Sequence, residues 1–267
     1  MPPKPPAEPG GHDLLAGKVA IVTAAAGTGI GSATARRLLA EGATLVISDA
    51  HERRLAETAA ELADATGATG AAGGEPPLAV ACDVTDEPQV QRMFDAALER
   101  HGRIDVVVNN AGLGGTADLV DMTDEQWHKV VDVTLTGTFR CTRAALRVLC
   151  GQGSGVIVNN ASVLGWRAQA GQAHYAAAKA GVMALTRSAA IEAAPFGVRV
   201  NAVAPSLAMH PFLAKVTSDE LLDDLAAREA FGRPAEPWEV ATVIAFLASD
   251  YSTYMTGEVV SVSSQHP

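Results

Sequence analysis

The chain has 267 residues, of which 48% are apolar, and a formal net charge of −10. This length predicts one large domain, because α/β folds commonly reach about 200 to 250 residues. The acidity argues against the basic surfaces with which proteins bind nucleic acid or an anionic membrane.

Cys82, Cys141 and Cys150 are odd in number and show no Cys-x-x-Cys spacing, which argues against both a disulfide framework and a metal site. No apolar run reaches the roughly eighteen residues of a membrane span, and the N-terminus lacks the apolar segment of a signal peptide. We therefore expect a cytoplasmic protein with free thiols and no bound metal.

The first part of the chain predicts a tail followed by a strand, a glycine-rich turn and a helix. Residues 1–12 are rich in Pro and Gly and predict a disordered tail, so the single domain is expected over residues 13–267. Lys18–Thr23 is typical of a buried parallel strand, and a helical pattern ends before Gly42. The turn between them predicts a dinucleotide-phosphate site, since small residues let backbone N–H groups approach phosphate at a helix N-terminus. The residues of this turn are Gly27, Thr28, Gly29, Ile30 and Gly31.

A carboxylate follows the second predicted strand, Ala43–Ser48. Asp49 at this place accepts hydrogen bonds from ribose hydroxyls and repels a 2′-phosphate, which favours NAD over NADP as the cofactor, with NADP kept as an alternative. The other interpretation of Asp49 is an N-cap of the next helix.

Strands and helices alternate through the rest of the chain. A helix is expected to open at Thr85, a longer one at the capping box Thr123–Gln126, and a third to end near Ala194. This order predicts an α/β fold with a doubly wound, parallel, seven-stranded sheet of the Rossmann type, whose ligands bind beyond the strand C-termini. The further strands are expected at Leu78–Cys82, Ile104–Val108, Gly155–Asn160, Val198–Val203 and Val259–Val262.

Tyr175 and Lys179 carry the proton-transfer chemistry in this interpretation. On a helix, a phenol four residues before an ammonium shares its face, and the cation is expected to lower the phenol pKa. Ser162, just after a strand, is expected to hold the reacting oxygen. Taken alone, the Tyr–Lys pair is more often a surface Tyr packed on a Lys stem.

Together, these motifs resemble the short-chain dehydrogenase/reductase family over about Leu15–Val262. The resemblance implies a Rossmann-type homotetramer that transfers hydride between a nicotinamide cofactor and an alcohol or ketone. It makes Tyr175 the acid/base, Lys179 its helper and a ribose ligand, and Ser162 the residue that orients the substrate oxygen. It also implies cofactor contacts by Asp83, Val84, Asn109, Ala111, Gly112 and Pro205.

The chain departs from the family pattern at two places in this machinery. The cofactor loop carries one extra residue, and counting back from Gly29 places Ala25 at the first family glycine. Thr134 replaces the catalytic Asn of the long helix. Because Thr can bond back to an earlier carbonyl, Thr134 is either an altered fourth catalytic residue or a structural one.

The segment after the sixth strand also departs from the pattern, with Ser206 at the family Gly and His210 at the family Thr. Residues 207–227 are either a mobile apolar lid or ordinary helix packing, and His210 is either functional or an exposed loop residue. Trp166 is either a pocket wall or a buried aromatic.

Three functions remain open on this sequence. The first is reversible hydride transfer on a bulky apolar secondary alcohol or ketone, because several motifs look like an actinobacterial subgroup acting on hydroxy-indane acyl-CoA intermediates of steroid-ring breakdown. The second is a 3-oxoacyl-(ACP or CoA) reductase, which shares the catalytic residues. The most distant is a non-catalytic nucleotide-binding protein, since a fold alone does not fix function.

Overall fold

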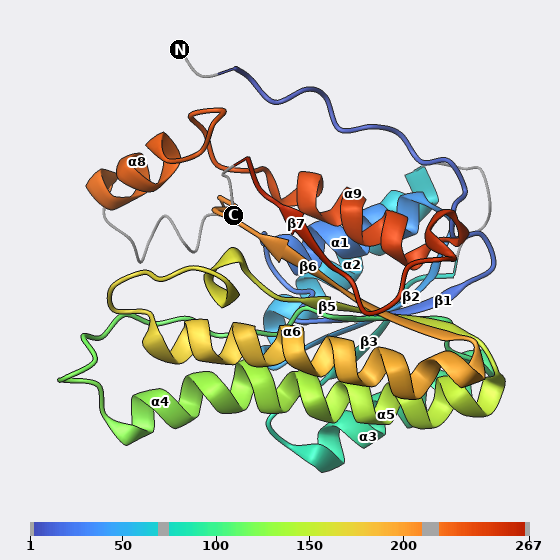
Figure 1. Ribbon diagram of the computed structural model, residues 1–267. Coiled ribbons are helices and arrows are strands. Elements are labelled where there is room, and N and C mark those ends of the chain that lie inside the picture. Colours follow the sequence, from blue (N-terminus) through green and yellow to red (C-terminus); the bar gives the residue numbers. More distant parts are fainter. Residues whose placement is uncertain (1–2, 69–74, 210–218, 265–267) are drawn as a thin grey trace.

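Short runs of Val, Ile and Ala form one parallel sheet in the computed structural model, which describes residues 3–68, 75–209 and 219–264. The sheet has seven strands in the order β3-β2-β1-β4-β5-β6-β7 (Figure 1). The predicted doubly wound α/β fold is thereby confirmed. The strands are β1 (Val19–Thr23), β2 (Thr44–Asp49), β3 (Leu78–Ala81), β4 (Val106–Asn109), β5 (Gly155–Asn160), β6 (Val198–Pro205) and β7 (Val259–Val262).

Helices cover both faces of this sheet, because strands that are buried on both sides need two apolar layers. On one face pack α1 (Ile30–Ala40), α2 (Glu52–Ala68) and α9 (Pro237–Ala248). On the other face lie α3 (Glu87–His101), α5 (Gly137–Gln152) and α6 (Ala173–Ala193), as Figure 1 shows. Two further helices are α4 (Asp124–Val131) and α8 (Asp219–Ala227). No helix in the described part of the chain is both long and apolar enough to cross a membrane.

Polar or turn-forming residues end five of the strands at one edge of the sheet. The strand order reverses between β1 and β4, and open α/β sheets bind ligands beyond the carboxyl ends near such a reversal. The predicted site residues therefore gather at this edge. The last residues of β1, β2, β4, β5 and β6 are Thr23, Asp49, Asn109, Asn160 and Pro205.

The structure corrects two helix predictions. Helix α3 is capped by Asp86, whose carboxylate accepts from Gln89 N at 3.1 Å, and not by Thr85, whose hydroxyl donates to Asp83. The predicted long helix is interrupted by a π-helical turn at Asp132–Thr136, although it begins with the expected capping box. The helix α9 was not predicted.

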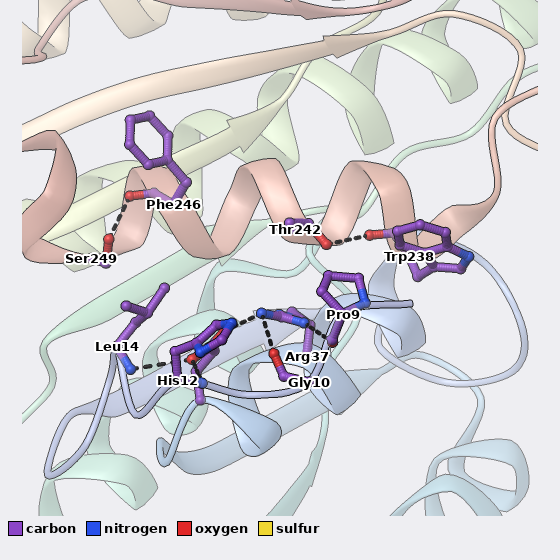
Figure 2. A network of polar contacts seen from close by, with 10 residues as sticks. Pro9, Gly10, His12, Leu14, Arg37, Trp238, Thr242, Phe246 and Ser249 are labelled. Atoms are coloured by element: carbon purple, nitrogen blue, oxygen red, sulfur yellow. Dashed lines mark hydrogen bonds and ion pairs between the residues drawn. The ribbon is translucent and has the colours of Figure 1, made fainter. Parts of the chain in front are cut away.

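The N-terminal segment is tied to the end of α1, where Arg37 and Glu41 form a buried ion pair. Figure 2 shows Arg37 beside Pro9, Gly10 and His12 of this segment. Arg37 donates to the carbonyl oxygens of Pro9 and Gly10, and Glu41 accepts from the backbone N–H groups of His12 and Leu14. Residues 3–12 contain no helix or strand. The predicted tail boundary at residue 12 therefore lies within a segment that contacts α1.

Candidate active site

Ser162 follows β5 and is held by the turn that it opens. Its Oγ accepts a hydrogen bond from Leu164 N at 3.2 Å, and only 8% of the residue is exposed. Tyr175 lies in the first turn of α6 and forms a side-chain hydrogen bond with Ser162. The hydroxyl and the phenol are thus brought together from two elements, as the sequence predicted.

Lys179 lies one helical turn after Tyr175 and is almost completely buried. Its Nζ donates to the carbonyl oxygen of Asn160 at 2.6 Å and lies 5.5 Å from the centre of the Tyr175 ring. The ammonium is therefore anchored on the last residue of β5, two residues before Ser162.

The pKa shifts at this pair differ from the prediction. Burial raises the pKa of Tyr175 to about 12, although the hydrogen bond with Ser162 opposes the shift. Burial also lowers the pKa of Lys179 to about 8. The predicted lowering of the Tyr175 pKa is thus wrong for the protein chain by itself. Loss of hydration disfavours the charged forms of both Tyr175 and Lys179. Both residues are shifted toward neutral forms.

A chain of amides that was missed in the sequence links Lys179 to the cofactor loop. Asn160, whose carbonyl oxygen holds Lys179, donates from Nδ2 to Asn110 Oδ1 at 2.9 Å. Asn110 donates in turn to the carbonyl oxygens of Thr23 and Ala24 at 3.2 and 3.1 Å. The sequence feature that could have predicted these hydrogen bonds is the pair of Asn residues at the ends of neighbouring strands.

Thr134 lies in the π-helical turn and bonds across to the loop after β4. Its hydroxyl accepts from Leu113 N at 3.0 Å and is placed to donate to Leu113 O at 3.1 Å, so it does not bond back to an earlier helix carbonyl as expected. Its own carbonyl accepts the Thr138 hydroxyl at 2.7 Å. These contacts favour a structural role, and a proton relay through Thr134 stays a prediction.

The predicted cofactor loop begins with a residue in a strained backbone conformation. Ala24 has φ +49°, a left-handed conformation that favours Gly. The left-handed backbone of Ala24, directly after Thr23, also suits the first family Gly position, so the assignment of Ala25 to that position stays a prediction.

Asp49 and Thr58 fasten the tip of this loop. The Asp49 carboxylate accepts hydrogen bonds from Ala26 N at 3.3 Å and from His51 N at 2.9 Å, so both of its oxygens already have a backbone partner. Thr58, buried on α2, accepts from Gly27 N at 3.2 Å. Gly27 N–H is therefore directed at α2, and the N–H groups from Thr28 onward are the better candidates for phosphate binding.

Three other predicted cofactor residues have side chains that contact neighbouring parts of the fold. Asp83 accepts from Thr85, and Val84 is buried against Gly137, so contact with adenine stays a prediction. The Asn109 amide lies in the core and donates to Thr142 at 3.1 Å and to Asn159 at 2.9 Å. A cofactor contact by Asn109 therefore stays a prediction.

The segment after β6 is described only in part. Pro205 ends the strand, and the hydroxyl of Ser206 borders a cavity of about 170 Å³ lined also by Glu229, Arg233 and Ser264. His210 lies outside the described residues, as does much of the proposed lid. Trp166, four residues after Ser162, is 44% exposed and so is not a core aromatic.

The residues present fit a nicotinamide dinucleotide. Helix α1 begins after Gly29 with no side-chain cap and no acidic residue in its first turn, which suits a pyrophosphate. A Cβ on Gly31 would lie 2.1 Å from Ala24 O, and one on Gly112 would lie 3.3 Å from Lys179 Nζ. Asn160 Oδ1 is buried and has no hydrogen-bond partner among the described residues.

Replacing Lys179 with Met is expected to stabilise the protein by up to about 3 kcal/mol at pH 7, since the folded-state pKa is lowered to about 8 from 10.5. Between about pH 8 and pH 10.5 the unfolded wild-type chain binds more protons than the folded protein. The free energy of unfolding of the wild type therefore increases as the pH rises through this range. Denaturant unfolding at pH 7 and pH 10 should therefore show the advantage of Lys179→Met shrinking. The exposed control Lys129→Met should show no such change, and a pH-independent advantage would contradict the assignment.

Replacing Thr58 with Val removes the acceptor of Gly27 N–H without a change of shape. We expect NADH binding, followed by its fluorescence, to weaken about 5- to 10-fold, the effect of one lost hydrogen bond. Thr58→Ser keeps the hydroxyl and should bind like the wild type. Equal dissociation constants for all three proteins would show that the loop does not depend on Thr58.

Residues 24–264 match the family described as enoyl-(acyl carrier protein) reductase. The chain is 66% identical over 263 residues, 98% of each protein, to a Mycobacterium tuberculosis (5R,7aS)-5-hydroxy-7a-methyl-1-oxo-2,3,5,6,7,7a-hexahydro-1H-indene-carboxyl-CoA reductase. It is 44% identical to a cis-4-hydroxycyclohexanecarboxylate dehydrogenase of Sinomonas cyclohexanicum, covering 94% of this chain and 96% of the relative.

A solved structure agrees with these sequence relatives. A short chain dehydrogenase from Mycobacterium smegmatis superposes with a TM-score of 0.86 at 60% identity, over 99% of each chain. The family uses NAD(H) or NADP(H), which the site fits. This chain therefore belongs to the short-chain dehydrogenase/reductase family of oxidoreductases.

Proposed function

We propose that this protein interconverts a secondary alcohol and a ketone on a ring-derived CoA thioester, with NAD as its cofactor. The observation that carries the proposal is the hydrogen bond between Ser162 and Tyr175 with the buried Lys179 one turn away. The relative that is 66% identical is named as a hydroxy-indene-carboxyl-CoA reductase, which supports the substrate class.

Each member of this trio has one task in the reaction. A nicotinamide cofactor held at this site would supply or accept the hydride. Ser162 donates a hydrogen bond to the substrate oxygen, while Tyr175 gives that oxygen a proton in reduction and takes it back in oxidation. Burial keeps Tyr175 protonated, which suits the acid role in ketone reduction. Lys179, whose Nζ donates to Asn160 O, would hold the cofactor ribose and return a proton to Tyr175.

Asp49 supports NAD as the preferred cofactor. The carboxylate ends β2 beside the phosphate loop, and its bonds to Ala26 N and His51 N fix its orientation. A 2′-phosphate placed here would meet a negative charge at close range, which costs several kcal/mol. Burial raises the Asp49 pKa, while the charge of Arg54 opposes this shift.

The names of the relatives favour the ring substrate over a straight-chain thioester. The exposed Trp166, four residues after Ser162, would suit an apolar wall for such a ring. A 3-oxoacyl reductase remains the second candidate, because it would use the same trio. The intact trio argues against a non-catalytic nucleotide-binding protein.

We also infer a homotetramer in the cytoplasm. Large apolar side chains stay exposed on three helices of the monomer: Phe139 on α5, Ile191 on α6 and Phe246 on α9. These helices would form the subunit contacts if their exposed side chains belong to contiguous apolar patches, which mark interaction sites. Free Cys82 and Cys141 suit a reducing compartment.

The function is tested by NADH absorbance with a hydroxy-indane carboxyl-CoA and a straight-chain 3-hydroxyacyl-CoA, each with NAD and NADP. We expect the ring substrate with NAD to give the highest kcat/KM, roughly 100-fold above NADP because of the Asp49 charge. Asp49→Asn should lower that ratio. Turnover of the straight-chain thioester alone would establish the second candidate instead.

A further inference from the structure

The imidazole of His174 lies between the catalytic helix and the loop after β4. The residue is 2% exposed, and its Nδ1 accepts a hydrogen bond from the backbone N–H of Tyr175 at 2.9 Å. None of the site assignments above involves this side chain.

The bond to Tyr175 N–H completes the start of α6. The first N–H groups of a helix have no partner within it, and the N-cap residue Gln172 supplies no side-chain bond. The first intrahelical bond runs from Ala176 N to Gln172 O at 2.8 Å, so Tyr175 N–H lies just before it. His174 therefore holds the backbone of the residue that carries the reactive phenol.

The accepting role of Nδ1 also fixes the protonation of the ring. A nitrogen that accepts a hydrogen bond carries no proton, so the neutral imidazole bears its proton on Nε2. That edge of the ring faces the loop, because a Cβ on Gly115 would lie 3.3 Å from Nε2. The lack of a side chain at Gly115 lets the loop backbone approach the imidazole closely.

The loop that contacts His174 is held by hydrogen bonds near both of its ends. Thr134 bonds both backbone groups of Leu113, as described above. At the other end, Ala117 N donates to Gly171 O at 3.0 Å, and Gln172 Nε2 donates to Thr116 Oγ1 at 3.2 Å. The ring is thus enclosed by a loop that has little freedom to move away from it.

We propose that His174 is a positioning residue of the reaction, which rests on the proposed function of Tyr175 as acid/base. Through Nδ1 it fixes the first turn of α6, and the fastened loop keeps the imidazole in place. The phenol must stay aligned with Ser162 and the substrate oxygen, and a misplacement of about 1 Å at such a site can cost about 100-fold in rate.

Three substitutions separate the two edges of the ring. His174→Asn places an acceptor near the position of Nδ1, His174→Gln places a polar group near Nε2, and His174→Ala removes both. The readouts are kcat and KM with a hydroxy-indane carboxyl-CoA, the NADH dissociation constant by fluorescence, and the melting temperature.

We expect His174→Ala and His174→Gln to lower kcat about 10- to 100-fold. NADH binding should stay unchanged in both, while His174→Asn should recover most of kcat. A purely structural role would instead lower the melting temperature and the NADH-binding fraction, with kcat per binding site preserved.

The inference is overturned if His174→Ala keeps the wild-type kcat, or if Gln rescues and Asn does not. Wild type and Tyr175→Phe are measured in the same assay. An inactive wild type, or an active Tyr175→Phe, would reject the proposed function itself, whereas an active wild type with unaffected His174 variants rejects only the role of His174.

Discussion

Burial of the Lys179 ammonium beneath Tyr175 is the constraint on which the rest of the site depends. A desolvated cation is costly, and here it is held by a single hydrogen bond from Nζ to Asn160 O, at 2.6 Å, among the described contacts. Its pKa is lowered to about 8 by that burial. The site thus holds an unfavourable charge at the place where the proposed reaction passes on a proton, and such shifted pKa values are common in active sites.

The fold places these groups by making parallel strands end at one edge. Asn160 ends β5, Thr23 ends β1, and Asn110 directly follows β4, which lies between those two strands. Asn110 bonds to Asn160 on one side and to the carbonyl oxygens of Thr23 and Ala24 on the other. One series of hydrogen bonds therefore links Asn160, which anchors Lys179, to the start of the cofactor loop.

Patterns local in sequence predicted the strands, the glycine-rich turn and the trio of Ser162, Tyr175 and Lys179, because periodicity and spacing report which residues share a face or an edge. Features that depend on distant partners were not predictable. Thr134 in the π-helical turn bonds to Leu113 in the loop after β4, and the direction of the Tyr175 pKa shift follows from burial by the whole fold. The left-handed φ of Ala24 is likewise a tertiary result, since its residue type favours the opposite.

The central claim is that Tyr175 transfers the proton while the cofactor transfers the hydride. Its most direct test is rapid-mixing absorbance of NADH oxidation, in a single turnover with the ketone of the hydroxy-indane carboxyl-CoA, for wild type and Tyr175→Phe. We predict that the variant binds NADH with the wild-type dissociation constant but oxidises it about 100- to 10,000-fold more slowly, the range for loss of a general acid. Oxidation at the wild-type rate by Tyr175→Phe would contradict the account.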